Sequence, residues 1–206
     1  MAVLLAVMAA LTTSLLLVPD LVSWDAQAFQ QLNAVQDAHL TDVLWMLTVL
    51  GSLGFGLVWV GGLWLMERNE LAAYVLVAIV AEVLIVTFMK EAILRPRPYD
   101  AIVDIGWLYS QDSWSFPSGH AAGAFALSTV IGLKVRKTLP LMAAIALVVA
   151  FSRIYIGVHY PLDVIAGSII GILVGLLVIN LDLTRLESLM ARGRSYLGRK
   201  LGRTAR

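Results

Sequence analysis

The sequence predicts an all-α integral membrane protein, a bundle of six transmembrane helices with both termini in the cytoplasm. Three observations predict this fold class: 60% of the 206 residues are hydrophobic, only 14% are charged, and six stretches are long and apolar enough to cross a bilayer. Soluble domains have about 45–50% apolar and about 25% charged residues, so this composition excludes an ordinary soluble domain and a disordered chain. The chain has no cysteine, which excludes disulfides and thiolate metal sites.

Each expected span is a mostly apolar run close to the length of about 20 residues that a helix needs to cross a bilayer. The six runs are residues 1–18, 43–66, 71–94, 118–133, 139–156 and 161–181. Helices are expected because lipid cannot form hydrogen bonds with exposed backbone groups. The first run could instead be a signal peptide, but it has no basic residue before its apolar part, so we expect it to be retained. Five glycines in the second run predict close helix contact.

Lysine and arginine are distributed unevenly between the two sides of these spans. Eleven of them lie on one side: Arg68, Lys134, Arg136, Lys137 and the seven basic residues of the tail. Because basic loops stay in the cytoplasm, this side is predicted to be cytoplasmic. We expect one membrane domain over residues 1–184 and a basic cytoplasmic tail over residues 185–206, which binds anionic lipid headgroups. The other side has only four basic residues: Lys90, Arg95, Arg97 and Arg153.

A first group of polar residues lies at the end of the third run. Pro96 and Pro98 end the helix there, with Lys90 about one turn before its end and Arg97 in the turn beyond. Both side chains can reach one point near the membrane surface. Alternatively, they only extend toward the lipid headgroups, as long cationic side chains commonly do.

A second group opens the fourth run. Ser118 suits the N-cap position, and Gly119 lets a ligand approach the backbone closely. The free N–H groups and the helix dipole at such a start form a site for an anion, and His120 lies in the first turn beside it. The alternative is a capped helix with an incidental histidine at the interface.

A third group joins the fifth and sixth runs and contains Arg153, His159 and Asp163. Pro161 fits the first turn of the sixth helix, where His159 and Asp163, four residues apart, can share one face. An aspartate beside a histidine nitrogen fixes its tautomer and stabilises the imidazolium. The alternative is a hydrogen bond that only stabilises the start of the helix.

The predicted topology places all three groups at the same face of the membrane. Together they supply three cations, a helix N-terminus, two histidines and one aspartate. These are the parts that phosphoryl transfer needs: charge neutralisation on the phosphoryl oxygens, a nucleophile and a proton donor. Carboxylates that could hold Mg²⁺ or Ca²⁺ are scarce in the three groups, so we expect no metal and no other cofactor.

The pattern Lys90-x6-Arg97-Pro98, Pro117-Ser118-Gly119-His120 and Ser152-Arg153-x5-His159-x3-Asp163 resembles the three-part signature of the type 2 phosphatidic acid phosphatase superfamily. This family includes small six-helix bacterial phosphatidylglycerophosphate and undecaprenyl diphosphate phosphatases. The resemblance implies an integral membrane lipid phosphatase that acts, without a metal, on phosphomonoester or diphosphate headgroups. Its active site would face the periplasm or the cell exterior from the plasma membrane.

The resemblance also implies the roles of individual residues. His159 would be the nucleophile that forms a phosphohistidine, Asp163 would orient it, and His120 would protonate the leaving oxygen and later assist the attacking water. The phosphate-binding residues would be Lys90, Arg97, Ser118, Gly119 and Arg153.

Two other functions remain as alternatives. A lipid phosphotransferase would use the same histidine with another acceptor. An anion transporter is disfavoured, because the polar residues gather at one membrane face and the sequence has no internal repeat. The expected partners are a lipid phosphate and the bilayer, and not nucleic acid. The lipid stays open between undecaprenyl diphosphate, phosphatidylglycerophosphate and phosphatidic acid, and the oligomeric state is not indicated.

Three further features carry weaker expectations. Glu82, within the third run, is expected to form a structural hydrogen bond to a neighbouring helix. Residues 24–40 predict an interfacial helix that either packs on the bundle or gates a lateral entrance. The loop after the third run could shape headgroup access through Tyr99, Asp100, Asp104, Asp112 and Trp114.

Overall fold

The computed structural model describes residues 10, 15–101 and 113–200, and all regular structure in these ranges is helical, as predicted. The expected first span lies almost entirely outside the described residues. In chain order the helices are η1 (Leu15–Leu17), α2 (Pro19–Asn33), α3 (Ala38–Thr48), η2 (Val49–Gly51), α4 (Leu53–Leu65), α5 (Asn69–Ile93), α6 (Pro98–Ala101), α7 (Gly119–Lys134), η3 (Arg136–Thr138), α8 (Leu139–Tyr155), α9 (Pro161–Val178) and α10 (Thr184–Lys200).

Three segments in the described part of the chain are long and apolar enough to cross a membrane. They are residues 69–101, which contain α5, residues 136–155, which contain α8, and α9 itself. The pair α3–η2 and α4 makes a fourth if it counts as one broken span. Helix α7 has 16 residues, which rise about 24 Å and fall short of a hydrocarbon core of about 30 Å. The chain is a multi-pass helical membrane protein, while six spans and cytoplasmic termini stay predictions.

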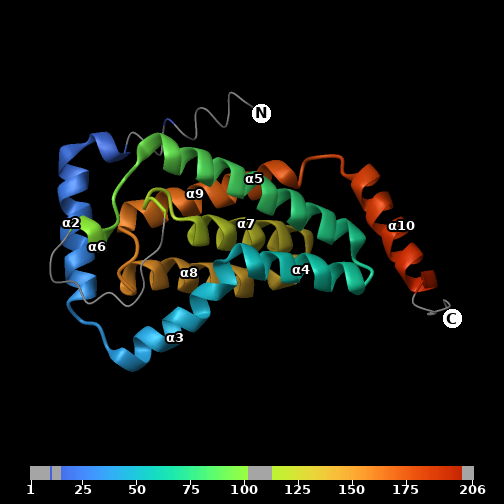
Figure 1. Cartoon of the computed structure of the whole chain (residues 1–206), viewed down its shortest axis with the longest axis horizontal. Coiled ribbons are helices and arrows are strands. Elements are labelled where there is room, and N and C mark those ends of the chain that lie inside the picture. Colours follow the sequence, from blue (N-terminus) through green and yellow to red (C-terminus); the bar gives the residue numbers. More distant parts are fainter. Residues whose placement is uncertain (1–9, 11–14, 102–112, 201–206) are drawn as a thin grey trace.

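Helix α7 is the centre of the bundle and packs against α5, α8 and α9 (Figure 1). Its contact with α9 depends on small residues, because a Cβ on Gly171 would lie 2.9 Å from the backbone nitrogen of Ala126. The close contact brings the N-terminal ends of the two helices together, and the N–H of Ser118 donates to the carbonyl of Asp163 at 2.9 Å. Two of the predicted motifs therefore meet where α7 and α9 begin.

The run 43–66, predicted as one span, is two helices that meet at an angle of 55°. The break follows Gly51, which packs so closely on α7 that a Cβ on Gly123 would lie 2.9 Å from its carbonyl oxygen. Helix α4 then starts at its own N-cap, where the Ser52 hydroxyl accepts the N–H of Phe55 at 3.2 Å. A tertiary contact therefore bends a stretch whose hydropathy is continuous.

The close contact predicted for the five glycines of this run is confirmed in part. A Cβ on Gly56 would lie 2.7 Å from Cδ1 of Ile79 on α5, so this glycine is needed where α4 and α5 touch. Gly61 and Gly62 face open space, and Gly54 has only a distant neighbour. Gly51 and Gly56 are thus the two glycines of this run that bring helices together.

The interfacial segment 24–40, predicted as one helix, is the end of α2, a turn and the start of α3. The side chain of Asp37 forms the boundary by accepting the N–H of Leu40 at 2.9 Å. Helix α2 packs on α8 and α9, and the fully buried ring of Phe29 lies 5.5 Å from that of Tyr160. These contacts support the packing interpretation of the segment.

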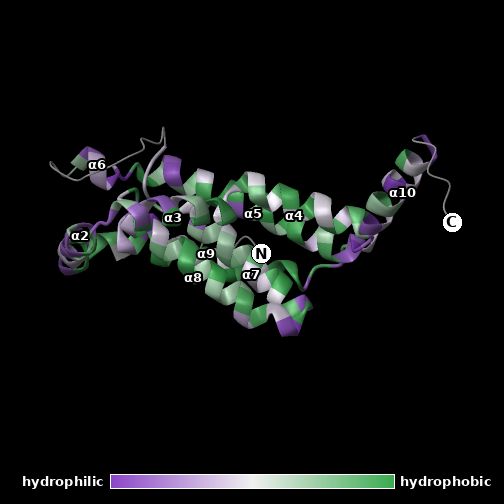
Figure 2. Ribbon diagram, turned by 90° about the horizontal axis from the view of Figure 1, so that it is seen from below, coloured by the Kyte–Doolittle hydropathy of each residue, from purple (hydrophilic) through white to green (hydrophobic). Residues whose placement is uncertain are grey.

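The two ends of the bundle carry different elements. Helices α2 and α6 lie at one end and α10 at the other (Figure 1). Hydrophobic residues dominate the helices between them, and hydrophilic residues gather at α2, α6 and α10 (Figure 2). Helix α10 docks on α4 through the indole N–H of Trp64, which donates to the carbonyl of Met190 at 2.8 Å. The basic tail is therefore remote from the start of α7 and α9.

Candidate active site

The three sequence motifs come together at the end of the bundle that α2 and α6 cover. The structure places Lys90 in the last turn of α5 and Arg97 just after it, and it places Ser118, Gly119 and His120 at the start of α7. Arg153 lies near the end of α8, His159 just before α9, and Asp163 in the first turn of α9.

The segment after α5 is shaped by its two prolines. Helix α5 ends at Leu94, which has a left-handed backbone with φ of 53°. Arg95 and Arg97 each precede a proline, which excludes the helical conformation and favours an extended one. Two residues apart in an extended chain, their side chains leave on the same face. Both reach the start of α9, where Arg95 bonds to Asp163 and Arg97 lies against His159.

The imidazole of His159 is buried, and its two nitrogens face different groups. Nδ1 lies 3.5 Å from Oδ2 of Asp163 and 3.4 Å from the hydroxyl of Ser115, while Nε2 lies 3.2 Å from Nη1 of Arg97. Since a carboxylate accepts hydrogen bonds, we assign the proton to Nδ1 and the free lone pair to Nε2. Burial, reinforced by Arg97 and Arg153, lowers the pKa of His159 well below its usual value, so the ring is neutral.

The carboxylate of Asp163 has no exposed surface, and hydrogen bonds hold both of its oxygens. Oδ1 accepts from Nη1 of Arg95 at 2.5 Å, and Oδ2 accepts from the hydroxyl of Ser115 at 2.5 Å and the N–H of Tyr160 at 2.9 Å. A buried carboxylate without such donors would be strongly destabilising. Asp163 is therefore held in one orientation beside His159.

Arg95 and Asp25 are parts of the site that the sequence reasoning missed. Nη2 of Arg95 donates to Oδ2 of the fully buried Asp25 at 2.6 Å, and Oδ1 of Asp25 accepts the N–H of Leu162 at 2.8 Å. The guanidinium also lies 4.1 Å from the ring centroid of Tyr160. Helix α2 is thereby tied to the start of α9. The one signal in the sequence was that Arg95 is among the four basic residues on the predicted outer side of the membrane.

Arg97 is fixed by the protein, whereas Arg153 has free hydrogen-bonding capacity. Arg97 donates to both oxygens of Ser113, at 2.7 Å and 3.0 Å, and to the carbonyl of Val158 at 2.8 Å. Arg153 is fully buried and donates to the hydroxyl of Thr48 at 3.0 Å, but its Nε and Nη2 have no partner among the described residues. Buried N–H groups without acceptors are unfavourable, so these two nitrogens favour an anion.

Lys90, Gly119 and His120 line a cavity of about 320 Å³ between α4, α5 and α7. The ammonium of Lys90 donates to the carbonyl of Trp114. Ser118 is different, because its hydroxyl caps α7 by accepting from Ala121 at 3.5 Å and its N–H is bonded to the backbone of α9. The polar groups of Ser118 thus order the start of α7.

Two weaker expectations have different outcomes. Of the residues expected to shape headgroup access, Tyr99, Asp100 and Trp114 lie in the described part, while Asp104 and Asp112 lie outside it. The expected hydrogen bond from Glu82 to a neighbouring helix is absent among the described residues, so that prediction is wrong.

In the same ranges, no three side chains of histidine, aspartate or glutamate gather in a way that could hold a metal ion.

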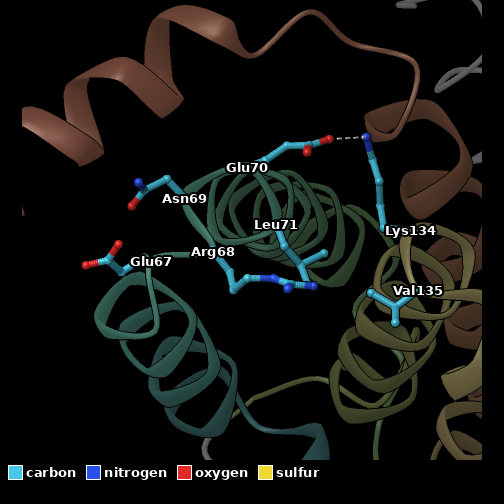
Figure 3. A pocket seen from close by; sticks show the side chains of 7 residues that line it. All are labelled: Glu67, Arg68, Asn69, Glu70, Leu71, Lys134 and Val135. Atoms are coloured by element: carbon cyan, nitrogen blue, oxygen red, sulfur yellow. Dashed lines mark hydrogen bonds and ion pairs between the residues drawn. The ribbon is translucent and has the colours of Figure 1, made fainter.

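A second hollow of about 270 Å³ lies at the other end of the bundle, between α4, α5 and α7 (Figure 3). Its charged residues are Glu67, Arg68, Glu70 and Lys134, and Nζ of Lys134 lies 3.0 Å from Oε1 of Glu70. No histidine lines it, and its lysine is already paired. It therefore lacks the groups for phosphoryl transfer that the first cavity has.

The chain is similar to known membrane phosphatases. The PAP2 superfamily matches residues 71–187, which is more than half of the chain. Phosphatidylglycerophosphatase B of Bacillus subtilis is 31% identical over 72% of this chain and 78% of its own, and undecaprenyl-diphosphatase BcrC of the same organism is 27% identical over 67% and 72%. The crystal structure of a transmembrane PAP2-type phosphatidylglycerolphosphate phosphatase from Bacillus subtilis superposes with a TM-score of 0.72 at 28% identity, covering 86% of this chain and 93% of that one.

The lowered pKa of His159 predicts that its ring stays neutral in mild acid. At pH 5.5 a free imidazole with a pKa of about 6.5 is about nine-tenths protonated. NMR spectra of protein labelled with ¹⁵N at its three histidines measure this, and the resonances of His159 are those that vanish in His159→Asn. At pH 5.5 we expect these resonances to keep the chemical shifts of a neutral ring. Imidazolium shifts for these resonances at pH 5.5 would contradict the assignment.

The bridge through Arg95 predicts coupled effects on stability and turnover. Arg95→Met leaves two buried carboxylates unpaired, which we expect to cost about 3–5 kcal/mol of stability and to lower kcat more than it changes KM. Adding Asp25→Asn removes one of these charges and should restore part of the thermal stability, without restoring kcat. The midpoint of thermal unfolding in detergent and steady-state kinetics measure both effects. Arg95→Met with wild-type stability and kcat would show that the bridge is dispensable.

Proposed function

Because this chain belongs to the PAP2 superfamily, we propose that it hydrolyses phosphomonoester or diphosphate headgroups of lipids through a phosphohistidine intermediate. The observation that carries this proposal is a neutral, buried His159 near Arg153, whose Nε and Nη2 have no partner among the described residues and are suited to phosphoryl oxygens. Arg97 lies 3.2 Å from Nε2 of the same imidazole and adds a second cation at the reacting nitrogen.

In the first step, Nε2 of His159 attacks phosphorus. The P–N bond forms, and the P–O bond to the lipid breaks with its electron pair passing to the lipid oxygen. This oxygen takes a proton from His120, which must be protonated when the anionic phosphate is bound. Asp163 stabilises the positive charge that develops on His159. Arg97 and Arg153 neutralise charge on the phosphoryl oxygens, together with Lys90 from the end of α5.

In the second step, water cleaves the phosphohistidine. His120 accepts a proton from the water as its oxygen attacks phosphorus, and the P–N bond breaks with its electron pair returning to His159. Inorganic phosphate leaves, and both histidines regain their starting states. Neither step uses a metal, since cations of the chain already lie around the reacting nitrogen.

The lipid and the sidedness are parts of the same proposal. Phosphatidylglycerophosphatase B and undecaprenyl-diphosphatase BcrC, both similar to this chain, support a phosphorylated lipid of one of these kinds. The distribution of basic residues supports an active site on the periplasmic or outer side of the plasma membrane. Residues 1–184 would form the phosphatase domain. On α10, exposed Leu189, Tyr196 and Leu197 beside basic residues support contact with the cytoplasmic lipid surface.

The proposed function predicts phosphate release from lipid phosphates in the presence of EDTA. We expect the purified protein in mixed micelles to release inorganic phosphate from phosphatidylglycerophosphate, phosphatidic acid or undecaprenyl diphosphate at an unchanged rate after EDTA treatment. Release into water also separates a phosphatase from a phosphotransferase, which needs another acceptor. Complete loss of activity with EDTA that Mg²⁺ restores would rule out the metal-independent mechanism.

The two histidines should respond differently to the leaving group. His159→Ala removes the covalent route for every substrate. His120→Ala removes only proton transfer, a contribution of roughly 10²–10⁴-fold, and this loss should shrink for an aryl phosphate whose phenolate needs no proton. Samples quenched in alkaline detergent should contain phosphoenzyme that is stable in base and labile in acid in His120→Ala, and none in His159→Ala.

Equal losses in both variants across leaving groups of widely different pKa would refute these roles. Phosphoenzyme trapped in His159→Ala would refute them as well. A matched control is His39→Ala, because His39 lies in α3 and outside the motifs.

A further inference from the structure

The cavity beside the catalytic residues continues along α5 into the membrane-embedded part of the bundle. Lys90 and His120 line its polar end, and Ile79, Glu82 and Leu127 line the part farther along the helix. Lys90 and Glu82 are eight residues apart on α5, which corresponds to about 12 Å along the helix axis. The cavity therefore has room for the part of a lipid that follows the reacting phosphoryl group.

Glu82 is an unusual residue in this cavity. It is only 6% exposed, and the described residues provide it with no hydrogen-bond or ion-pair partner. Its neighbours along the cavity are mostly aliphatic, such as Val83 and Val86. A buried polar group without a partner is unfavourable, and an ionisable residue inside a membrane bundle is typical of a functional site. A bound molecule would supply the missing partner.

The cavity is also open to the outside of the bundle. Leu53 at the start of α4 lines it and is 51% exposed, and Thr87 and Glu91 on α5 are exposed lining residues as well. Leu53 follows the break at Ser52 where the chain bends by 55°. Because α5 is long and apolar enough to cross the membrane, an opening on its flank lets a lipid enter from the side.

We propose that this cavity binds the glycerol ester region of a glycerolipid phosphate, with Glu82 hydrogen-bonded to an ester carbonyl. The site thereby favours glycerolipid phosphates over polyprenyl diphosphates. This inference rests on the proposed phosphatase function and specifies its substrate class.

The chemistry of the two lipid classes explains the preference. Glu82 is buried without a counter-charge, so it is a neutral carboxylic acid, and a carboxylic acid can donate a hydrogen bond to an ester carbonyl. A polyprenyl chain has no polar atom beyond its diphosphate, so it would fill the cavity and leave Glu82 without a partner. Sites built to hydrogen-bond a substrate discriminate strongly against analogues that lack the bonding group.

The test compares Glu82→Leu and Glu82→Gln with the wild-type chain on three substrates in mixed micelles. These are dioleoyl phosphatidylglycerophosphate, farnesyl diphosphate and the soluble p-nitrophenyl phosphate. For Glu82→Leu we expect kcat/KM to fall about tenfold for the glycerolipid, as for the loss of one hydrogen bond, and not to fall for the other two. Glu82→Gln should keep most of the activity because its amide also donates.

Two controls make the outcome specific. Glu70→Leu removes an acid from the other end of α5 and should leave the substrate preference unchanged. The diether analogue of the glycerolipid lacks the carbonyls, so wild type should use it about tenfold less well than the ester, and Glu82→Leu should use both equally.

The possible outcomes separate this inference from the proposed function. If Glu82→Leu loses kcat/KM equally on all three substrates, or on none of them, the inference is overturned while the phosphatase activity of the wild type stands. Equal use of ester and ether by wild type would overturn it too, even if Glu82→Leu fails to fold. Absence of phosphate release from every lipid by wild type would instead refute the proposed function, and the inference with it.

Discussion

The buried carboxylate of Asp163 is the interaction on which the rest of the site depends. It has no contact with solvent, so its charge requires donors from the protein, and these come from Arg95, Ser115 and a backbone N–H of its own turn. Its main-chain carbonyl also accepts the N–H of Ser118 and thereby fixes the start of α7 relative to α9. Asp163 thus joins segments that are far apart in sequence, and its fixed carboxylate orients His159.

Two of the positive charges around His159 have no negative partner in the described part of the chain, and this excess of positive charge serves the proposed reaction. Asp163 is paired with Arg95, which it shares with Asp25, whereas Arg97 and Arg153 lie near the imidazole with no carboxylate paired to either among the described residues. Burial first, and these cations in addition, lower the pKa of His159 and keep the imidazole in its neutral, nucleophilic form. A phosphate group that enters the site supplies the missing negative charge. The same cations therefore maintain the nucleophile and attract its substrate.

The sequence allowed the local parts of the site to be predicted, because residues close in sequence stay close in space. His159 and Asp163, four residues apart, do lie side by side, although His159 precedes α9 and does not share a helix face with Asp163 as predicted. The ion pair of Arg95 with Asp25 spans 70 residues, and no local pattern connects an acid in an interfacial helix with a cation that precedes a proline. The fold behaves likewise: hydropathy marks the apolar helices, but the bend at Ser52 follows from a tertiary contact of Gly51 with α7.

The chemistry of the site does not by itself select a lipid, because a histidine and cations accept any accessible phosphate. Selection of a lipid must therefore depend on groups farther from phosphorus. Helix α5 supplies a group near the phosphate and a group farther away. It carries Lys90 near the reacting atoms and Glu82 within the membrane-embedded part of the cavity. Because the helix is continuous between them, its rise sets their separation at about 12 Å irrespective of the loops. In the proposed arrangement α5 therefore fixes the distance between the site for the phosphate and the group that binds an ester carbonyl of the lipid.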